Sequence, residues 1–248
     1  MASIHLQNVS VSFPVLSADS RSLKRKIIGA GVGGRIGWDE DNHVLINALN
    51  NISIDIEHGE RVGLVGHNGA GKTTLLRVMA GIYEPQQGEV VVKGRVAPLF
   101  DVGMGMDPEI SGHDNIMLRG LYLGMSKAEI ESRTDDIVAF TELGPFMEMP
   151  IRTYSAGMQA RLAFAISTSI QPEILLLDEG IGAGDAEFLE KSRDHLDAFA
   201  KRARILVLAS HSEALIRQLC TKAILLERGS VVCGGEIDDV YERYHRTA

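Results

Sequence analysis

Short apolar runs alternate with longer amphipathic segments along most of the chain. Residues 3–13 and 51–57 alternate between apolar and polar positions, which is typical of half-buried strands. Wholly apolar runs end near residues 65, 178 and 209, and their short length predicts strands buried on both faces. Helical segments separate these runs, so we expect an α/β protein with a mostly parallel sheet at its core.

The apolar spacing becomes helical at residues 71–80, directly after one of the buried strands. It is helical again through residues 101–154, which predicts a helical lobe that interrupts the sheet. Residues 14–47 break both patterns and contain the basic segment RSLKRKII, so we interpret them as an insertion with a short basic helix and a loop. A hairpin is predicted at 222–235 and a closing helix at 236–246.

Composition limits the class of protein. The 248 residues are 45% hydrophobic and 23% charged, with a formal net charge of −8, which disfavours a large nucleic-acid surface, so we expect no nucleic-acid partner. No apolar run approaches the roughly 18 residues of a membrane span. The two cysteines form no motif and suggest a reducing compartment. We expect one domain over 1–248, with a core at 1–100 and 155–248, a helical subdomain at 101–154 and an insertion at 14–47.

The segment GHNGAGKTT follows a predicted strand and opens a predicted helix. Gly66, Gly71, Lys72 and Thr73 match the phosphate-loop pattern G-x-x-x-x-G-K-[ST] in its required context. Glycines let consecutive backbone N–H groups surround a phosphate, the lysine adds a cation, and the threonine hydroxyl reaches Mg²⁺. A glycine-rich turn with a chance lysine is the alternative. The expected ATP-binding residues of the loop are Gly66, His67, Asn68, Gly69, Ala70, Gly71, Lys72, Thr73 and Thr74.

A second glycine-rich stretch, GAGVGG at 29–34, satisfies the pattern G-x-G-x-x-G. No predicted strand precedes it and no clear crossover helix follows it, although both are needed for dinucleotide binding. We therefore interpret it as a surface loop.

Two buried strands end in polar residues suited to phosphate chemistry. Asp178 and Glu179 follow ILLL, at the strand end where α/β sheets bind ligands. Asp178 suits Mg²⁺, a hard cation that prefers oxygen ligands, and Glu179 suits a base that polarises water. An acidic pair that caps a helix is the alternative. His211 follows the next strand, where it can donate to a phosphate, although a structural histidine is the commoner role.

The segment RTYSAGMQARLAFAI at 152–166 places small residues just before a predicted helix. Such a turn can bind an anion through backbone N–H groups at the helix start. In isolation, the same residues also read as an ordinary helix start with Ser155 as the N-cap.

The order of these motifs resembles the ATP-binding cassette family over essentially the whole chain. The resemblance implies a RecA-like parallel sheet with an antiparallel β subdomain and an inserted helical subdomain. It also implies that ATP and Mg²⁺ lie between two copies, with the signature turn of one copy on the γ-phosphate held by the other. The turn normally reads L-S-G-G-Q; here Tyr154, Ala156 and Met158 depart from it. The implied ATP-binding residues in trans are Ser155, Ala156, Gly157 and Met158.

Further departures resemble one subgroup, the ATPase subunits of polysaccharide exporters. After Glu179 the sequence reads GIGAGD, so Asp185 takes the place of an aspartate that contacts the other subunit. Asp101 stands where a Mg²⁺-binding glutamine is usual and is a third candidate metal ligand. Phe13 matches the aromatic position that stacks on adenine, and a packed strand phenylalanine is the competing interpretation.

The resemblance implies an ATP-hydrolysing homodimer that powers export of a lipid-linked polysaccharide such as O-antigen. It would act on a separate permease dimer at the cytoplasmic face of the bacterial inner membrane. The basic part of the insertion would face lipid or pyrophosphate headgroups, or simply solvent. No carbohydrate-binding domain follows the last helix, so we expect chain-length control to lie elsewhere. A small-solute importer and a soluble non-transport ATPase remain the alternatives.

Overall fold

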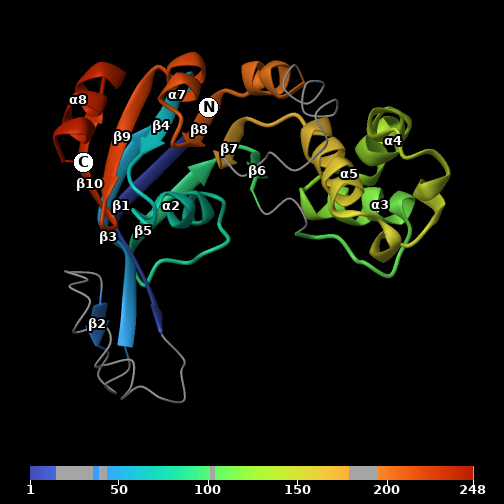
Figure 1. Ribbon diagram of the computed structural model, residues 1–248, viewed down its shortest axis with the longest axis horizontal. Coiled ribbons are helices and arrows are strands. Elements are labelled where there is room, and N and C mark those ends of the chain that lie inside the picture. The colour runs from blue at the N-terminus through green and yellow to red at the C-terminus, as the bar shows by residue number, and fades with distance from the viewer. Residues whose placement is uncertain (15–35, 39–43, 101–103, 179–194, 248) are drawn as a thin grey trace. The chain divides into compact units, whose positions relative to one another are not determined.

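The computed structural model describes residues 1–14, 36–38, 44–100, 104–178 and 195–247. These residues form two compact units (Figure 1). Unit 1 comprises Met1–Lys93 and Val207–Ala248, and unit 2 comprises Gly94–Leu206. The predicted basic helix of the insertion and the GAGVGG stretch lie outside the described residues.

An antiparallel sheet in unit 1 is built on two long strands. Strand β1 pairs with β3, with Ile4 opposite Ile56, and on its other side with β5. Inward-facing side chains such as Ile4, Val9 and Ile52 are fully buried, which is why the alternating pattern predicted strands here. The strand order is β2-β3-β1-β5. The bounds are β1 (Ser3–Pro14), β2 (Ile36–Trp38), β3 (Val44–Ile56) and β5 (Gln87–Lys93).

Strand β3 corrects one boundary of the sequence analysis. It begins at Val44, whereas residues 44–47 were expected to belong to the insertion. The early part of β3 pairs with the end of β1, with Ile46 opposite Phe13. Pairing with a partner strand extends β3 through a segment that is too short to predict a strand by itself and does not continue the alternation seen from residue 51.

The part of the second sheet that lies in unit 1 carries the phosphate loop. Strand β4 pairs in parallel with β9, with Leu64 opposite Ile224, and β9 forms an antiparallel hairpin with β10. Strand β8 follows β4 in the strand order. The buried strands and the closing hairpin are therefore confirmed. The bounds are β4 (Arg61–Val65), β8 (Ile205–Ala209), β9 (Lys222–Glu227) and β10 (Ser230–Gly235).

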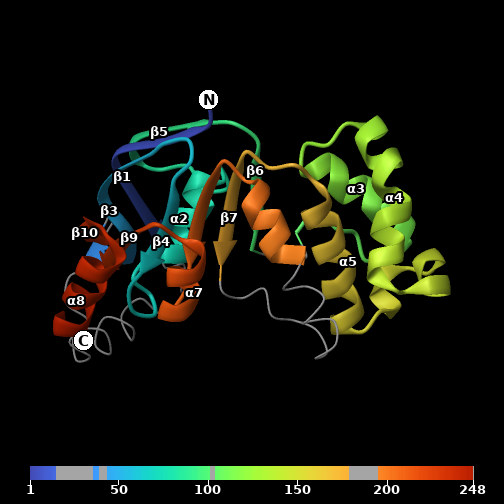
Figure 2. The ribbon, with the colours of Figure 1, turned by 90° about the horizontal axis from the view of Figure 1, so that it is seen from above.

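The described part of unit 1 includes helices α2, α7 and α8 (Figures 1 and 2). Helix α2 (Lys72–Met79) has Ala80 as its C-cap, and Gly81 then adopts a φ of 71°, as expected of a residue that terminates a helix. Ser212 caps helix α7 (Glu213–Leu219) by accepting from the backbone N–H of Leu215. Helix α8 (Ile237–Thr247) closes the chain and buries Val240 and Tyr241.

Unit 2 combines two parallel strands with a group of helices. Strand β6 pairs with β7, and helices α3, α4 and α5 pack against one another. The predicted lobe 101–154 lies within this unit. Across the described part of the chain, no helix is long and apolar enough to cross a bilayer. The bounds are β6 (Val96–Leu99), α3 (Gly112–Tyr122), α4 (Lys127–Thr141), α5 (Ala156–Ser169) and β7 (Ile174–Asp178), with 3-10 turns η1 (Gly144–Glu148) and η2 (Ile151–Thr153).

A buried arginine links the helices of unit 2. The Arg119 guanidinium of α3 donates to the Met104 carbonyl at 2.5 Å and to Ser167 Oγ of α5 at 2.8 Å. Burial lowers the pKa of Arg119 to about 10, because the charged form is separated from water. These contacts connect α3 and α5 with the backbone at Met104.

Candidate functional site

The phosphate loop connects the end of β4 to the start of α2. Gly66 has a φ of 147°, and a Cβ at this position would collide with the carbonyl oxygen of Leu226. Gly71 has a φ of 110°, and a Cβ there would lie 2.8 Å from the Ala48 carbonyl oxygen. The glycines of the motif are therefore required by the backbone itself, because both space and dihedral angle exclude a side chain.

Lys72 and His211, which were expected to act on the same phosphate, lie together in unit 1. The Lys72 ammonium donates to the carbonyl oxygens of Gly66 at 2.5 Å and His67 at 3.2 Å. Its Nζ atom is also 3.3 Å from Nε2 of His211. Lys72 is only 8% exposed. The fold thus brings a buried cation and an imidazole, which are far apart in sequence, together at the phosphate loop.

The middle of the loop is open to solvent. His67, Asn68 and Gly69 are exposed, and the Ala70 N–H donates to the His67 carbonyl at 3.0 Å to close the turn. Thr73 and Thr74 are half-buried in the first turn of α2. The helix therefore presents its positive end and its first hydroxyls at the loop, an arrangement suited to an anion.

Phe13 near the end of β1 has an aromatic neighbour that the sequence analysis missed. Its ring lies edge-on to Tyr83, with centroids 5.1 Å apart. The Tyr83 hydroxyl accepts from Arg77 Nη1 at 3.2 Å, and the same guanidinium lies 5.6 Å from the Tyr83 ring centroid. Phe13 is half-buried, so part of its surface stays accessible to a ligand.

The signature turn opens helix α5 in unit 2. Ser155 is exposed and its Oγ accepts from the Met158 N–H at 3.2 Å, so it is the N-cap. Ala156 is exposed, Gly157 and Met158 are half-buried, and a Cβ on Gly157 would have no neighbour closer than 3.9 Å. The start of a 14-residue helix is therefore open to solvent.

One departure from the family pattern has a structural explanation. Tyr154 is buried, as the usual leucine would be, and its hydroxyl donates to the Phe146 carbonyl at 2.5 Å. Burial raises the pKa of Tyr154 further above neutral pH, so the hydroxyl remains a donor. Tyrosine therefore occupies the buried position expected of leucine and adds a hydrogen bond to η1.

The candidate metal ligands are described only in part. Asp178 is the half-buried last residue of β7 in unit 2, and Thr73 belongs to unit 1. Glu179, Asp185 and Asp101 lie outside the described residues. Among the residues that are described, no three His, Cys, Asp or Glu side chains form a cluster that could hold a metal. The hydroxyl and carboxylate oxygens of Thr73 and Asp178 are nevertheless the hard donors that suit Mg²⁺.

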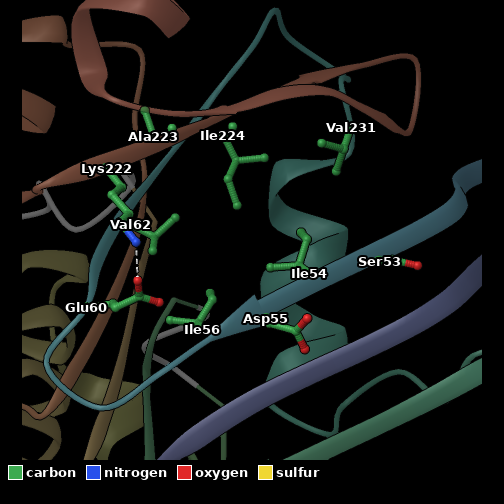
Figure 3. A pocket seen from close by; sticks show the side chains of 12 residues that line it. Ser53, Ile54, Asp55, Ile56, Glu60, Val62, Lys222, Ala223, Ile224 and Val231 are labelled. Atoms are coloured by element: carbon green, nitrogen blue, oxygen red, sulfur yellow. Dashed lines mark hydrogen bonds and ion pairs between the residues drawn. The ribbon is translucent and has the colours of Figure 1, made fainter.

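A separate cavity of about 320 Å³ lies in unit 1 (Figure 3). Lys222 forms an ion pair with Glu60 at one side of it, and this pairing lowers the pKa of the Glu60 carboxyl. The lining contains no residue of the phosphate loop and does not include His211, so this cavity is distinct from the candidate site. The lining residues are Ser53, Ile54, Asp55, Ile56, Glu60, Val62, Lys222, Ala223, Ile224, Val231, Gly234 and Gly235.

Several solved structures share the fold. A dimeric post-hydrolysis ATP-binding cassette, MJ0796 bound to ADP and Pi, matches with a TM-score of 0.67 and 21% identity, over 94% of this chain and 98% of that one. An ATP-binding subunit of an ABC transporter matches with a TM-score of 0.68 and 20% identity, over 98% and 93%. These likenesses confirm the P-loop fold with its mixed sheets.

Sequence comparison gives closer relatives. The O-antigen export system ATP-binding protein RfbE of Yersinia enterocolitica is 47% identical, over 93% of this chain and 97% of its own length. RfbB of Myxococcus xanthus is 41% identical over 81% of this chain, and the teichoic acids export protein TagH of Lactococcus lactis is 36% identical over 98%. The matched regions span about half of these two relatives, 46% and 50%. Residues 49–182 match the model of the ABC transporter family. The chain therefore belongs to the ABC transporter family.

Proposed function

We propose that this chain binds and hydrolyses ATP, and that the released energy drives export of a lipid-linked polysaccharide through a separate permease. The observation that carries the proposal is the Lys72 ammonium, held among the loop carbonyls 3.3 Å from His211. A buried lysine beside a histidine, at the end of a glycine-rich loop and a helix start, is suited to a triphosphate.

Within one copy, the loop 66–71 and the start of α2 bind the β-phosphate through backbone N–H groups. Lys72 exchanges its carbonyl contacts for phosphate oxygens and neutralises the charge that develops during cleavage. His211 donates to the γ-phosphate. Because His211 already lies against Lys72, both reach the phosphate without a large rearrangement.

The carboxylates complete the chemistry. Thr73, Asp178 and Asp101 are the residues that would hold Mg²⁺, which when bound neutralises charge on the phosphate oxygens. Glu179 accepts a proton from the attacking water or orients it. At the adenine end of the nucleotide, Phe13 stacks on the adenine ring, and Tyr83 packs edge-on against Phe13.

The signature turn serves the other copy. Ser155 Oγ, the Gly157 N–H and the start of α5 donate to the γ-phosphate bound by the partner's loop. The exposure of Ser155 and Ala156 supports this role, because an ordinary buried helix start would be unable to reach a second chain. ATP then joins the two copies, Asp185 contacts the partner, and hydrolysis releases them.

The export role is supported by the relatives, whose names assign O-antigen and teichoic acid export. Unit 2 exposes large apolar side chains on α3, with Leu118 at 41%, Leu121 at 52% and Tyr122 at 52%. An apolar group of this kind is typical of a protein interface. We propose that the permease docks here and holds the chain at the cytoplasmic face of the inner membrane.

Glu179→Gln tests the catalytic base. We expect ATP binding to persist while turnover falls about 10²–10⁴-fold, because the amide cannot accept the proton. ATP should then accumulate a closed dimer, measured by sedimentation velocity beside phosphate release. A monomer with near-normal turnover would contradict the assignment of Glu179.

The same variant tests the transported substrate in cells. Loss of surface polysaccharide, with accumulation of the lipid-linked form inside, is the outcome expected of an exporter. A small-solute importer would leave surface polysaccharide unchanged.

Leu121→Glu tests the docking surface. A carboxylate should weaken association with the permease, because it must lose water on entering an apolar interface. We expect detergent-extracted permease to retain less of this variant, while ATP binding by the isolated chain is unchanged. Val232→Glu is the matched control, since Val232 is an exposed apolar residue of unit 1 at 36%. Equal retention of the Leu121→Glu variant and the wild type would rule out this surface.

A further inference from the structure

The last helix of the chain lies against the phosphate loop. Tyr244 of α8 places its ring next to the imidazole of His67, with centroids 5.0 Å apart and the planes tilted by 41°. The Tyr244 hydroxyl is 3.4 Å from His67 Nδ1, at the long end of hydrogen-bonding distance. The 5.0 Å between the ring centroids is typical of aromatic rings in packing contact. Both residues belong to unit 1, and the motif that identified the loop gave no indication of this neighbour.

His67 is well placed to transmit this contact to the reacting groups. Its backbone carbonyl accepts from the Lys72 ammonium at 3.2 Å and from the Ala70 N–H at 3.0 Å. The same residue therefore touches α8 with its side chain and the loop lysine with its main chain. A shift of the imidazole would move the carbonyl that helps to orient Lys72.

Helix α8 also reaches the segment that carries His211. Helix α7 begins two residues after this histidine. Arg217 of α7 donates to Asp238 of α8 at 2.6 Å, and its guanidinium lies 5.7 Å from the Tyr241 ring centroid. His245 of α8 is 3.5 Å from Glu213, the first residue of α7. Helix α8 thus contacts both His67 of the loop and helix α7, which begins two residues after His211.

The inner face of α8 is packed against the sheet, which fixes the position of the helix. Val240 and Tyr241 are 1% and 4% exposed, and the helix packs on β9 and β10. Tyr241 and Tyr244 pack with ring centroids 6.2 Å apart. The Tyr241 hydroxyl is buried and has no hydrogen-bond partner among the described residues. Ring packing, rather than a polar contact of this hydroxyl, therefore fixes the face from which Tyr244 extends.

We propose that α8 is a positioning element of the nucleotide site, with Tyr244 as the positioning residue that holds His67 and, through its carbonyl, Lys72. The proposal rests on the proposed function, because the ligand of the loop is taken to be ATP. Any change that displaces α8, such as a partner bound to this end of the chain, would then lower the affinity for nucleotide.

Tyr244→Ala tests the proposal in the 248-residue chain. Loss of the ring should weaken binding of a fluorescent ATP analogue about five- to tenfold, because the loop is no longer preorganised. The KM for ATP should rise by a similar factor, with kcat retained. Tyr244→Phe keeps the ring and should stay within about twofold of wild type.

Glu242→Ala is the matched control on the same helix. It removes an exposed ion pair with Arg246 and leaves the contact with His67 untouched, so binding should be unchanged. Thermal melts of all variants report whether the fold is retained. Should Tyr244→Ala fail to fold, His67→Ala removes the same contact from the other side and is expected to give a similar loss of affinity.

Hydrogen exchange of the 66–72 segment without nucleotide separates this proposal from the proposed function. Faster exchange in Tyr244→Ala than in wild type is expected. Unchanged exchange and unchanged affinity in a folded Tyr244→Ala variant would overturn the positioning role. A loss of affinity in Glu242→Ala equal to that in Tyr244→Ala would do the same. Failure of the wild-type chain to bind the ATP analogue would instead overturn the proposed function, while faster exchange in the variant would still support the contact.

Discussion

Replacement of Lys72 by alanine should lower ATP hydrolysis by about 10²–10³-fold, the usual cost of removing one group that stabilises transition-state charge. Lys72 is 8% exposed and its ammonium is held by the carbonyls of Gly66 and His67, so it is directed into the loop before a phosphate arrives. A small residue leaves the loop with backbone N–H groups but without its cation. Phosphate release measures the loss of hydrolysis, and titration with a fluorescent ATP analogue measures any change in nucleotide affinity.

Lys127→Ala is the control for the loss of a positive charge. Lys127 is exposed in unit 2 and pairs with Glu131 on the surface of α4. Exposed pairs of this kind contribute little, so stability and hydrolysis should both be close to wild type. Turnover within about tenfold of wild type in Lys72→Ala would contradict the role given to this lysine.

Substitution of Ser155 by arginine should abolish ATP-driven dimerisation and leave nucleotide binding by a single copy intact. Ser155 caps α5 and is exposed, so a long side chain there need not disturb the core of unit 2. It would fill the space in which the partner's γ-phosphate meets the helix start. Sedimentation velocity with ATP measures the dimer, and analogue titration measures binding by one copy.

Ser155→Thr is the matched variant, because threonine keeps a hydroxyl that can cap the helix. It should dimerise in ATP much as the wild type does. An unaltered dimer in Ser155→Arg would show that the signature turn is not part of the shared site.

Much of the α/β core could be predicted because its signals are local. The runs at 61–65 and 205–209 can be predicted as strands from their own residues. The glycine pattern before Lys72 likewise predicts a loop, and its backbone excludes side chains at Gly66 and Gly71. The start of β3 was expected to belong to the insertion because residues 44–47 directly follow polar residues, form only a short run and do not continue the alternation seen from residue 51. Their strand conformation depends on pairing with the end of β1, which lies far away in sequence.

The contacts that refine the site were not predictable from one sequence. Tyr244 and His67 are 177 residues apart, and no motif links a tyrosine near the end of the chain to a phosphate loop. Tyr83 likewise reads as a residue of an ordinary turn after α2, although it supports Phe13. Such pairs arise from the arrangement of whole elements, whereas sequence patterns report on neighbours along the chain.

The central claim is that each copy completes the nucleotide site of the other, and mixing two inactive variants tests it most directly. A dimer of one Lys72→Ala copy and one Ser155→Arg copy would contain one site with both defects and one site with an intact loop and an intact signature turn. An equimolar mixture should therefore regain hydrolysis, on the order of a quarter of the wild-type sites for random pairing. If each copy built its site alone, every site would keep a defect, and a mixture no more active than the separate variants would contradict the account.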